Sequence, residues 1–531
     1  MKTSHHRDAK TPIPFAGNVR QTSGSINSVQ SISKNNENRS EFVALVIGLA
    51  TFLAAAASYA ALRHASFVAD NALDFKAFYC AGEAVLKHAD PYRVEPLRAC
   101  MHRLEPSYGP AWLVTPAPFP GYVLALFAAL AKLPFESARV VWEIVTVVSV
   151  LVAGVALARL TQWSPLMTTL ALIPTAGFVN LLYGETTPIV VAALTLGALE
   201  LERGRFVVPA LAAGVSLIEP HVGAPVVLAL FLAVPRARPW VACVALTIAV
   251  VSVATLRLRY NLEYFRFELP LQAFSEVTAD DQYSLTWLLS ALGQRPATAL
   301  ALGSASYALM LALGVALSTY LGTRRRLGYV MLLPPAAVAL GGTFVHDVQI
   351  AVAIPFAFLL ACDVRPLRLW ALGAVPLLLL PATSMRHPGF PIPALTALAV
   401  VYLIGRMIAK NQPPLQRALI YVAQAALVGV VAMWLWSGHR GAAAVTPPVA
   451  IAAPKISPDD YAPVVWGAYL RATGDLGKPK LHYIVEKIPG WFGLIVLVFG
   501  AARAVLITRH SSPGKFDRTR AALDAEPAAL F

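Results

Sequence analysis

The sequence predicts an all-α polytopic membrane protein. Of its 531 residues, 57% are hydrophobic and only 14% are charged, and the mean hydropathy is +0.61. A soluble domain carries roughly 25% charged residues. A soluble enzyme of this length would need a polar surface that this composition cannot supply. The surplus apolar side chains must face lipid, which excludes a water-soluble enzyme.

Apolar runs that could cross a bilayer recur along the chain. The first, at 42–62, has about 21 residues, enough at 1.5 Å per residue to cross a hydrocarbon core of about 30 Å. Between 118 and 256 we expect about seven spans, several of only about 15 residues, so we expect some to be tilted, broken or re-entrant. Further spans are expected at 297–320, 328–342, 347–362, 368–382, 391–408, 417–436 and 491–507.

Basic residues predict the orientation, because Lys and Arg accumulate in cytoplasmic loops. The triplet Arg324–Arg326 is the strongest such marker, and the charge rule also places 202–205 inside. Counting the expected crossings from the extracytoplasmic first loop does not place 202–205 inside, so the count and the charge rule conflict somewhere before residue 202. With both ends inside, the number of spans is even, and we expect about 12 to 14. The net charge of +14 then needs no nucleic-acid partner, and no basic and aromatic stripe for one is present.

Composition divides the chain into four parts. Residues 1–40 are predicted to be a disordered cytoplasmic tail, and 41–410 a transmembrane core with a first extracytoplasmic loop at 63–116. Residues 411–507 are expected to hold C-terminal transmembrane helices and a polar loop at 437–490, and 508–531 a cytoplasmic tail. Within the first loop, 75–87 and 91–103 have the spacing of amphipathic helices that lie at the interface. Cys80 and Cys100 share this loop and are either a disulfide or two free thiols.

A few ionisable residues interrupt the apolar sequence, and these are the candidate functional residues. A charge in a membrane costs a few kcal/mol, so each one is a functional hypothesis by default. They are Asp74, Glu185, Glu219, His221, His346 and Asp347.

Each candidate also has a structural interpretation. Asp74 begins the first amphipathic helix and could be its N-cap, worth about 1 kcal/mol, or a general base; one carboxylate can serve as both. His346 follows a glycine pair and could belong to a plain loop between two short spans. For Glu185 and Glu219, short loops at span ends are the favoured interpretation.

Four groups of motifs follow one another between residues 42 and 410. They are Asp74 with Tyr79, Ala81 and Ala89-Asp90-Pro91-Tyr92; Pro118-Phe119-Pro120-Gly121-Tyr122 with Leu133-Pro134, Ala138 and Trp142; Tyr183-Gly184-Glu185 with Gly204-Arg205, Ala213-Gly214 and Glu219-Pro220; and Asp281-Gln282-Tyr283-Ser284-Leu285 with Phe344-Val345-His346. In this order they resemble glycosyltransferase family 87 of the GT-C superfamily, which includes polyprenol-phosphate-mannose-dependent mannosyltransferases. Glu185, Glu219 and Phe344 stand where that pattern has Gln, Lys and Trp.

The resemblance implies a GT-C-type bundle that transfers a hexose such as mannose from a polyprenyl-phosphate donor to a lipid or glycan acceptor, with inversion. Asp74 would be the general base, and His346 would orient the acceptor or contact the leaving phosphate. The multi-pass protein would lie in a bacterial inner membrane, among membrane lipids, with its active site on the extracytoplasmic side.

The remaining candidates are substrate-binding residues, of which the cations are placed to stabilise the leaving phosphate. The set comprises Lys76, Tyr79, Tyr92, Glu185, Glu219, His221, Arg257, Arg259, Arg266, Gln282 and Asp347. No metal motif is visible and no cofactor is expected, although a divalent cation held by Asp74 and the donor phosphate stays open.

Two other functions fit the same composition. In a transporter or lipid flippase, Glu185, Glu219 and the two histidines His221 and His346 would line a path near the membrane midplane. In a structural membrane subunit the ionisable residues would not converge. A transferase requires Asp74 and His346 to meet outside the membrane, above a groove open to lipid.

Overall fold

The structure is a computed structural model that describes residues 73–105, 112–279, 281–379, 400, 402–404, 455–473 and 481–510. Every regular element in these ranges is a helix, and their β pairing is limited to two isolated bridges, Arg93 with Tyr461 and Gln282 with His346. The helical fold class is therefore confirmed for this part of the chain. The expected tail 1–40 and the spans 42–62 and 417–436 lie outside the described residues, as do most of the span 391–408 and of the tail 508–531.

Within the described ranges, four helical segments are long and apolar enough to cross a membrane. They are α5 (Phe135–Thr161), the run Pro235–Thr278 that contains α11 (Arg238–Glu263), α14 (Pro296–Arg324) and α22 (Leu481–His510). The 27 residues of α5 extend about 40 Å, more than a hydrocarbon core of about 30 Å. Ile144, Leu246 and Phe499 on these helices are 57%, 67% and 72% exposed. Such surfaces are unfavourable in water and are expected of helices that face lipid.

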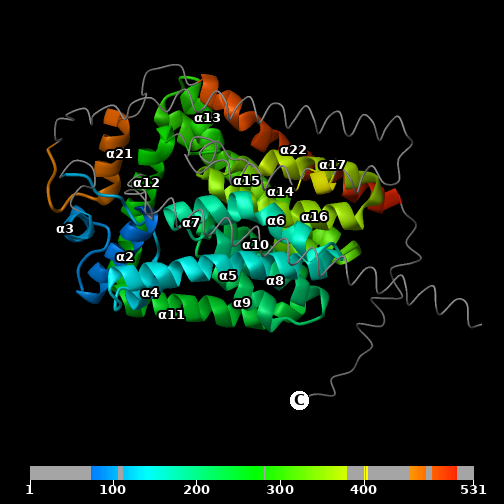
Figure 1. Ribbon diagram of the computed structural model, residues 1–531, viewed down its shortest axis with the longest axis horizontal. Helices are drawn as coiled ribbons and strands as arrows, with labels where there is room; N and C mark the ends of the chain where they lie inside the picture. Colours follow the sequence, from blue (N-terminus) through cyan, green and yellow to red (C-terminus); the bar gives the residue numbers. More distant parts are fainter. Residues whose placement is uncertain are drawn as a thin grey trace, which may run out of the picture.

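Shorter apolar helices pack between and around the long ones (Figure 1). They are α4 (Gly121–Leu130), α6 (Pro165–Leu172), α8 (Thr187–Glu202), α9 (Val207–Ser216), α10 (Pro220–Ala233), α15 (Gly328–Gly341), α16 (Ala353–Asp363) and α17 (Arg368–Leu378). Met331 and Leu332 in α15 and Phe356 and Phe358 in α16 are completely buried. The centre of the bundle is therefore apolar.

One end of the bundle is rich in arginine. The helices α5, α8, α14, α16 and α22 all end there, as the contacts of two arginines that follow α14 show. Arg326 binds Glu202 of α8 at 3.2 Å and the Leu160 carbonyl of α5 at 2.9 Å. Arg325 binds Asp363 of α16 at 2.6 Å and reaches Thr508 of α22. Cations are favourable beside the negative ends of helix dipoles. We call this the arginine end; its residues are Arg203, Arg205, Arg236, Arg238, Arg324, Arg325, Arg326, Arg365, Arg368 and Arg509.

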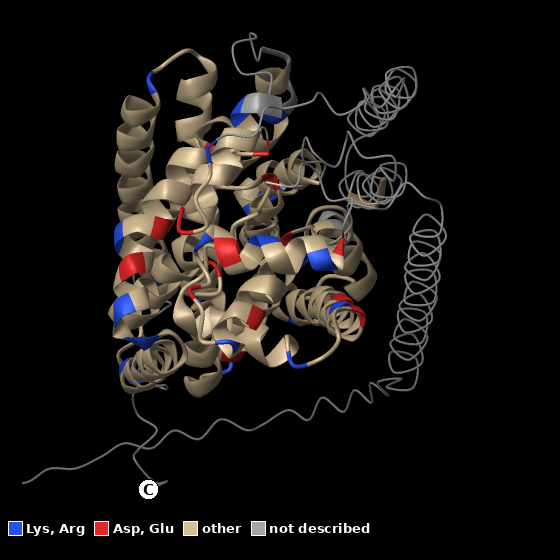
Figure 2. Cartoon of the chain, turned by 90° about the vertical axis from the view of Figure 1, so that its left-hand side faces the viewer, with Lys and Arg blue, Asp and Glu red and all other residues tan. Residues whose placement is uncertain are grey.

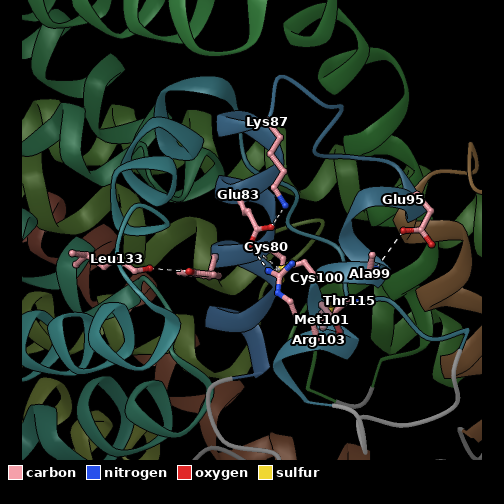
Figure 3. The surroundings of a disulfide bond; sticks show 11 residues. Cys80, Glu83, Lys87, Glu95, Ala99, Cys100, Met101, Arg103, Thr115 and Leu133 are labelled. Atoms are coloured by element: carbon pink, nitrogen blue, oxygen red, sulfur yellow. Dashed lines mark hydrogen bonds and ion pairs between the residues drawn. A yellow bond between two sulfur atoms is a disulfide. The ribbon is translucent and has the colours of Figure 1, made fainter.

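The opposite end, which we call the cavity end, is built from α2 (Leu73–Leu86), α3 (Val94–Leu104), α12 (Leu269–Ser275), α13 (Leu285–Ala291) and α21 (Ala462–Thr473) (Figure 1). Figure 2 looks onto this end and shows how few charged residues the helices carry. A disulfide between Cys80 and Cys100, whose Cα atoms are 5.6 Å apart, joins α2 to α3, and Glu83 pairs with Arg103 beside it (Figure 3). The sequence did not decide between a disulfide and two free thiols, and the structure contains the disulfide.

The helix α2 occupies the first predicted amphipathic segment, but it does not lie on a surface. Phe75, Phe78 and Tyr79 are buried in an apolar core that includes Phe127 and Trp142. The expectation of an interfacial helix with one wet face is therefore corrected for α2, because α4 and α5 cover it. Burying α2 fixes the direction in which its first turn points.

The short helix α4 accounts for the conflict in the count of crossings. Its 10 residues extend about 15 Å, half of a hydrocarbon core. Both of its ends lie at the cavity end: Tyr122 donates to the carbonyl of Leu217 before α10, and the carbonyl of Leu133 accepts from Tyr79 of α2. Because α4 does not run to the arginine end, the residues that follow it begin α5 on the side where α4 started.

The disulfide should stabilise the cavity end. It closes a loop with a sequence separation of 20, and removing such a crosslink typically costs about 3 kcal/mol. We expect the double variant Cys80→Ser/Cys100→Ser to unfold at a clearly lower temperature in detergent than wild type. Cys243→Ser/Cys362→Ser, which removes the two free cysteines, is the matched control and should leave the unfolding temperature unchanged. Equal effects of the two double variants would show that the crosslink contributes nothing.

Candidate functional site

A cavity of about 690 Å³ lies at the cavity end, between α2, α10, α12, α14, α21 and the loops that join them. Most of its wall is apolar or aromatic. Its acidic and histidine side chains are Asp74, Glu185, Glu219, His221, Glu276, Asp281 and His346. Five of these, all except Glu276 and Asp281, are candidates that the sequence singled out, and they come from segments far apart in the chain.

Asp74 lies inside the first turn of α2 and not at its N-cap. Its side chain lines the cavity and is hydrogen-bonded to Glu185. Burial raises the pKa of Asp74 to about 7, although the nearby His346 lowers it. A carboxyl with this pKa is poised to exchange a proton near neutral pH, as a general base must.

Gly184 brings Glu185 to Asp74. Its φ of +80° is a left-handed conformation that favours glycine. A Cβ at this position would lie 2.5 Å from the Cβ of Phe75, so only glycine lets the loop approach the start of α2 so closely. Trp142 holds the loop in place by donating to the Gly184 carbonyl at 2.7 Å.

The hydrogen bond between Asp74 and Glu185 requires a proton, because two ionised carboxylates are acceptors only. Burial, and then the charge of Asp74, raise the pKa of Glu185 to about 8. Near neutral pH the two groups therefore share about one proton and titrate as a pair. Their hydrogen bond lowers the pKa of Asp74 and raises that of Glu185, so Asp74 is the ionised member and Glu185 is the donor.

Glu219 occupies the N-cap position of α10 and lines the same cavity. Its Oε1 accepts hydrogen bonds from the hydroxyls of Thr186 at 3.0 Å and Thr187 at 2.7 Å. Its Oε2 has no hydrogen-bond partner among the residues that the structure describes, and the residue is only 4% exposed. Burial raises the pKa of Glu219 to about 7.

His346 forms an ion pair with Asp281, with Nδ1 and Oδ2 2.9 Å apart. Burial lowers the pKa of His346, but Asp281 and neighbouring carboxylates outweigh this and hold it well above its usual range. Conversely, burial raises the pKa of Asp281, but His346 brings it below its ordinary value. The pair is therefore an imidazolium beside a carboxylate.

Backbone pairing brings these two residues together. Tyr283 donates to the carbonyl of Val345 at 2.6 Å, and Asp347 donates to the carbonyl of Asp281 at 2.8 Å. On the other side of His346, Gln349 Oε1 accepts from the His346 amide at 2.9 Å and lies 3.0 Å from Nε2 of His221. One glutamine thus links both histidines of the cavity.

Sequence reasoning missed four residues of the site. Asp281 stands in a motif that we quoted, but its role as the partner of His346 was not predicted. Glu276 accepts from Trp466 of α21 at 2.6 Å. Lys487 of α22 is completely buried, donates to the carbonyl of Gln282 at 2.5 Å and lies 3.5 Å from the ring centre of Trp287. The site therefore extends beyond residues 41–410, and only tertiary contacts could reveal the part that α21 and α22 supply.

Three residues expected to bind substrate are held in the apolar core. Lys76 is buried and pairs with Glu105. The hydroxyls of Tyr79 and Tyr92 donate, each at 2.8 Å, to the carbonyls of Leu133 and Phe119. None of the three lines the cavity.

The three predicted arginines also lie away from the cavity, and all are exposed. Arg259 pairs with Glu263 at 2.9 Å, Arg266 stacks on Phe267, and Arg257 stands at a break in α11. Gln282 and Asp347 do not line the cavity either, but both support His346: the Gln282 amide lies 3.4 Å from its Nε2. Within the described ranges, no Lys or Arg lines the cavity.

No group of three His, Cys, Asp or Glu side chains in the described part of the chain is arranged to hold a metal ion.

No family model matches the sequence, and no curated protein and no solved structure is significantly similar to it. The function must therefore be argued from the geometry of this cavity and from the order of the sequence motifs.

The approach of Gly184 to α2 can be tested by adding one methyl group. Gly184→Ala forces the loop and α2 apart, because the new Cβ would overlap Phe75, and it strains a backbone with positive φ. We expect at least a tenfold loss of the activity proposed below. Gly204→Ala is the matched control: it also has a positive φ, +72°, but a Cβ there meets nothing within 4 Å. Equal losses in both variants would assign the effect to backbone strain alone.

Proposed function

We propose that the protein is a membrane glycosyltransferase that moves a hexose from a polyprenyl-phosphate donor to a lipid or glycan acceptor with inversion. One observation carries the proposal: Asp74 and His346, far apart in sequence, line a single cavity at one end of an apolar helical bundle. The order of the motifs around them, which resembles glycosyltransferase family 87, supports the same function and a GT-C-type bundle of about 12 to 14 spans.

In this mechanism Asp74 is the general base. Its carboxylate takes the proton of the acceptor hydroxyl while that oxygen bonds to the anomeric carbon and the bond from that carbon to the donor phosphate oxygen breaks. A single displacement through an oxocarbenium-like transition state inverts the configuration and needs no covalent carboxylate nucleophile. Glu185 orients Asp74 through their hydrogen bond.

His346 is suited to the leaving phosphate. It is the cation that faces the cavity in the described part of the chain, and Asp281 fixes its ring and favours its charged form. A preorganised cation stabilises negative charge as it develops on a leaving group. The aromatic and aliphatic wall, which includes Phe119, Phe265 and Leu269, suits a lipid-linked donor.

Two features support an extracytoplasmic cavity. The positive-inside rule places the arginine end in the cytoplasm, which leaves the cavity end on the other side. The Cys80–Cys100 disulfide fits an oxidising compartment such as the space outside a bacterial inner membrane. The proposal therefore includes an acceptor that reaches Asp74 from outside.

The transporter hypothesis fits less well. It requires ionisable groups near the middle of the membrane, whereas the carboxyl groups and histidines that line the cavity lie at one end of the described bundle. The middle of the bundle is occupied by buried apolar side chains of α15 and α16. A structural subunit does not account for the convergence of so many ionisable side chains on one cavity.

Removing the carboxylate of Asp74 should abolish most of the transfer. With membranes supplied with a radiolabelled polyprenyl-phosphate hexose, we expect Asp74→Asn and Asp74→Ala to slow sugar transfer by about 10²- to 10⁴-fold, the usual contribution of a general base. Glu83→Gln is the matched control on the same helix, because Glu83 pairs with Lys87 and Arg103 outside the cavity. Transfer at the wild-type rate by both Asp74 variants would refute the assignment.

The shared proton predicts the pH dependence of wild type. We expect kcat/KM to rise as the pH passes about 7, where Asp74 loses its proton, and to fall above about 8, where Glu185 loses the proton that holds the pair together. Glu185→Gln keeps a neutral donor to Asp74 but cannot ionise. Its pH profile should retain the acid limb and lose the alkaline fall; an unchanged alkaline limb would contradict the role of Glu185.

A further inference from the structure

We propose that the cavity selects a substrate that carries a protonated amino group, and that Glu219 and Glu185 bind this group. The inference deepens the proposed function by naming a property of its substrate. It depends on the charges that face the cavity and on the environment of Glu219.

The charges that face the cavity do not balance. Five carboxyl groups line it, and the opposing cation in the described part of the chain is His346, whose charge Asp281 already compensates. Glu276 receives N–H donors from Trp466 at 2.6 Å and Gln272 at 3.2 Å. Four carboxyl groups remain without a cation: Glu276, which has these two neutral donors, Glu219, and the hydrogen-bonded pair of Asp74 and Glu185.

Glu219 has an oxygen that the described protein leaves without a donor. Thr186 and Thr187 both donate to Oε1, whereas Oε2 has no hydrogen-bond partner among the described residues. An unpaired buried polar atom in a native structure calls for an explanation, because leaving it unpaired costs free energy. An ammonium group, with three N–H donors, would satisfy this oxygen.

Glu185 is close enough to Glu219 to raise its pKa when both are ionised, and the protonated form of Glu185 keeps a carbonyl oxygen that can accept a hydrogen bond. An ammonium group between these two carboxyl groups would form charge-assisted hydrogen bonds, which are stronger than those between neutral groups. The aromatic rings of Phe78, Phe119 and Phe344 line the same cavity, and aromatic faces attract a cation. A volume of about 690 Å³ is sufficient for a sugar with an amino substituent.

A metal ion is the other cation that carboxylates could bind. A divalent metal that is held by protein side chains alone needs several ligands that converge on one point, and in the described residues no group of three His, Cys, Asp or Glu side chains does so. An ammonium group needs only two or three acceptors. The arrangement therefore favours an amine.

The first experiment measures binding without turnover. The unfolding temperature of the full-length protein in lipid nanodiscs is recorded with glucosamine, N-acetylglucosamine, glucose or MgCl₂. We expect glucosamine alone to raise the unfolding temperature of wild type, and Glu219→Gln to lose this shift while its own unfolding temperature stays close to that of wild type, since glutamine still accepts from both threonines. Glu136→Gln, on the exposed first turn of α5, is the matched control and should keep the shift.

Three outcomes of this experiment would overturn the proposal. One is an equal shift with glucosamine and N-acetylglucosamine, which differ in the charge on nitrogen. Another is a glucosamine shift that survives in Glu219→Gln. The third is a shift that depends on Glu219 but appears with MgCl₂ in place of glucosamine, which would assign the site to a metal ion.

The second experiment asks whether the amine belongs to the donor or to the acceptor. Transfer is compared between a polyprenyl-phosphate hexosamine and its N-acetylated form, and between acceptors with a free and with an acetylated amine. We expect a preference of roughly 10- to 100-fold in kcat/KM for the free amine in one of the two arms, the range of a hydrogen bond to a charged group, and its loss in Glu219→Gln. Equal kcat/KM for the free and the acetylated forms in both arms would overturn the inference.

The two proposals fail separately. Transfer of a neutral hexose that depends on Asp74 but shows no preference for an amine would leave the proposed function standing and remove this inference. A shift of the unfolding temperature by glucosamine that depends on Glu219, with no transfer from any polyprenyl-phosphate donor, would support the amine site and remove the proposed function.

Discussion

The antiparallel contact between residues 281–283 and 345–347 is the interaction on which the site depends. It places Asp281 beside His346, and without that carboxylate an imidazolium in this cavity would be an uncompensated buried charge. The contact is held from behind by α22, where Lys487 donates to the carbonyl of Gln282 and Trp491 to that of Tyr283. A helix near the end of the chain thus stabilises a pairing between two loops of the core.

The position of Asp74 depends on aromatic packing. Phe75 stacks on Trp142 with ring centres 5.6 Å apart and contacts Phe127, so α2 is fixed against α4 and α5. The same Trp142 binds the carbonyl of Gly184, which carries Glu185 to Asp74. Trp142 therefore fixes the positions of both Asp74 and Glu185, and burial in this apolar surrounding raises the pKa values of the two carboxyl groups.

The sequence predicts the helical class well, because apolar runs of this length have few other solutions. It also singles out Asp74 and His346, which line one cavity in the structure, because charged residues are so scarce that each one kept in apolar sequence is informative. It cannot show which polar residues find a partner within the fold: Tyr92 looks like a binding residue, but a backbone carbonyl occupies its hydroxyl. Nor can it show that Trp466 and Lys487 reach the site, because helical periodicity does not say which helices pack together.

In the described cavity, carboxyl groups lie beside the cation His346, which is paired with Asp281. These charges would limit the orientation of a lipid-linked sugar in the cavity. In the proposed reaction, a phosphate beside the ionised Asp74 and beside Glu219 would be repelled, whereas the charged His346 would attract it. The sugar of the proposed donor would then extend toward Asp74 and toward the Oε2 of Glu219, which has no hydrogen-bond partner among the described residues. The imidazolium of His346, paired with Asp281, and the carboxylate of Asp74, hydrogen-bonded to Glu185, thus place opposite charges in one cavity, and the proposed transfer of a sugar from a phosphate to a hydroxyl would use both.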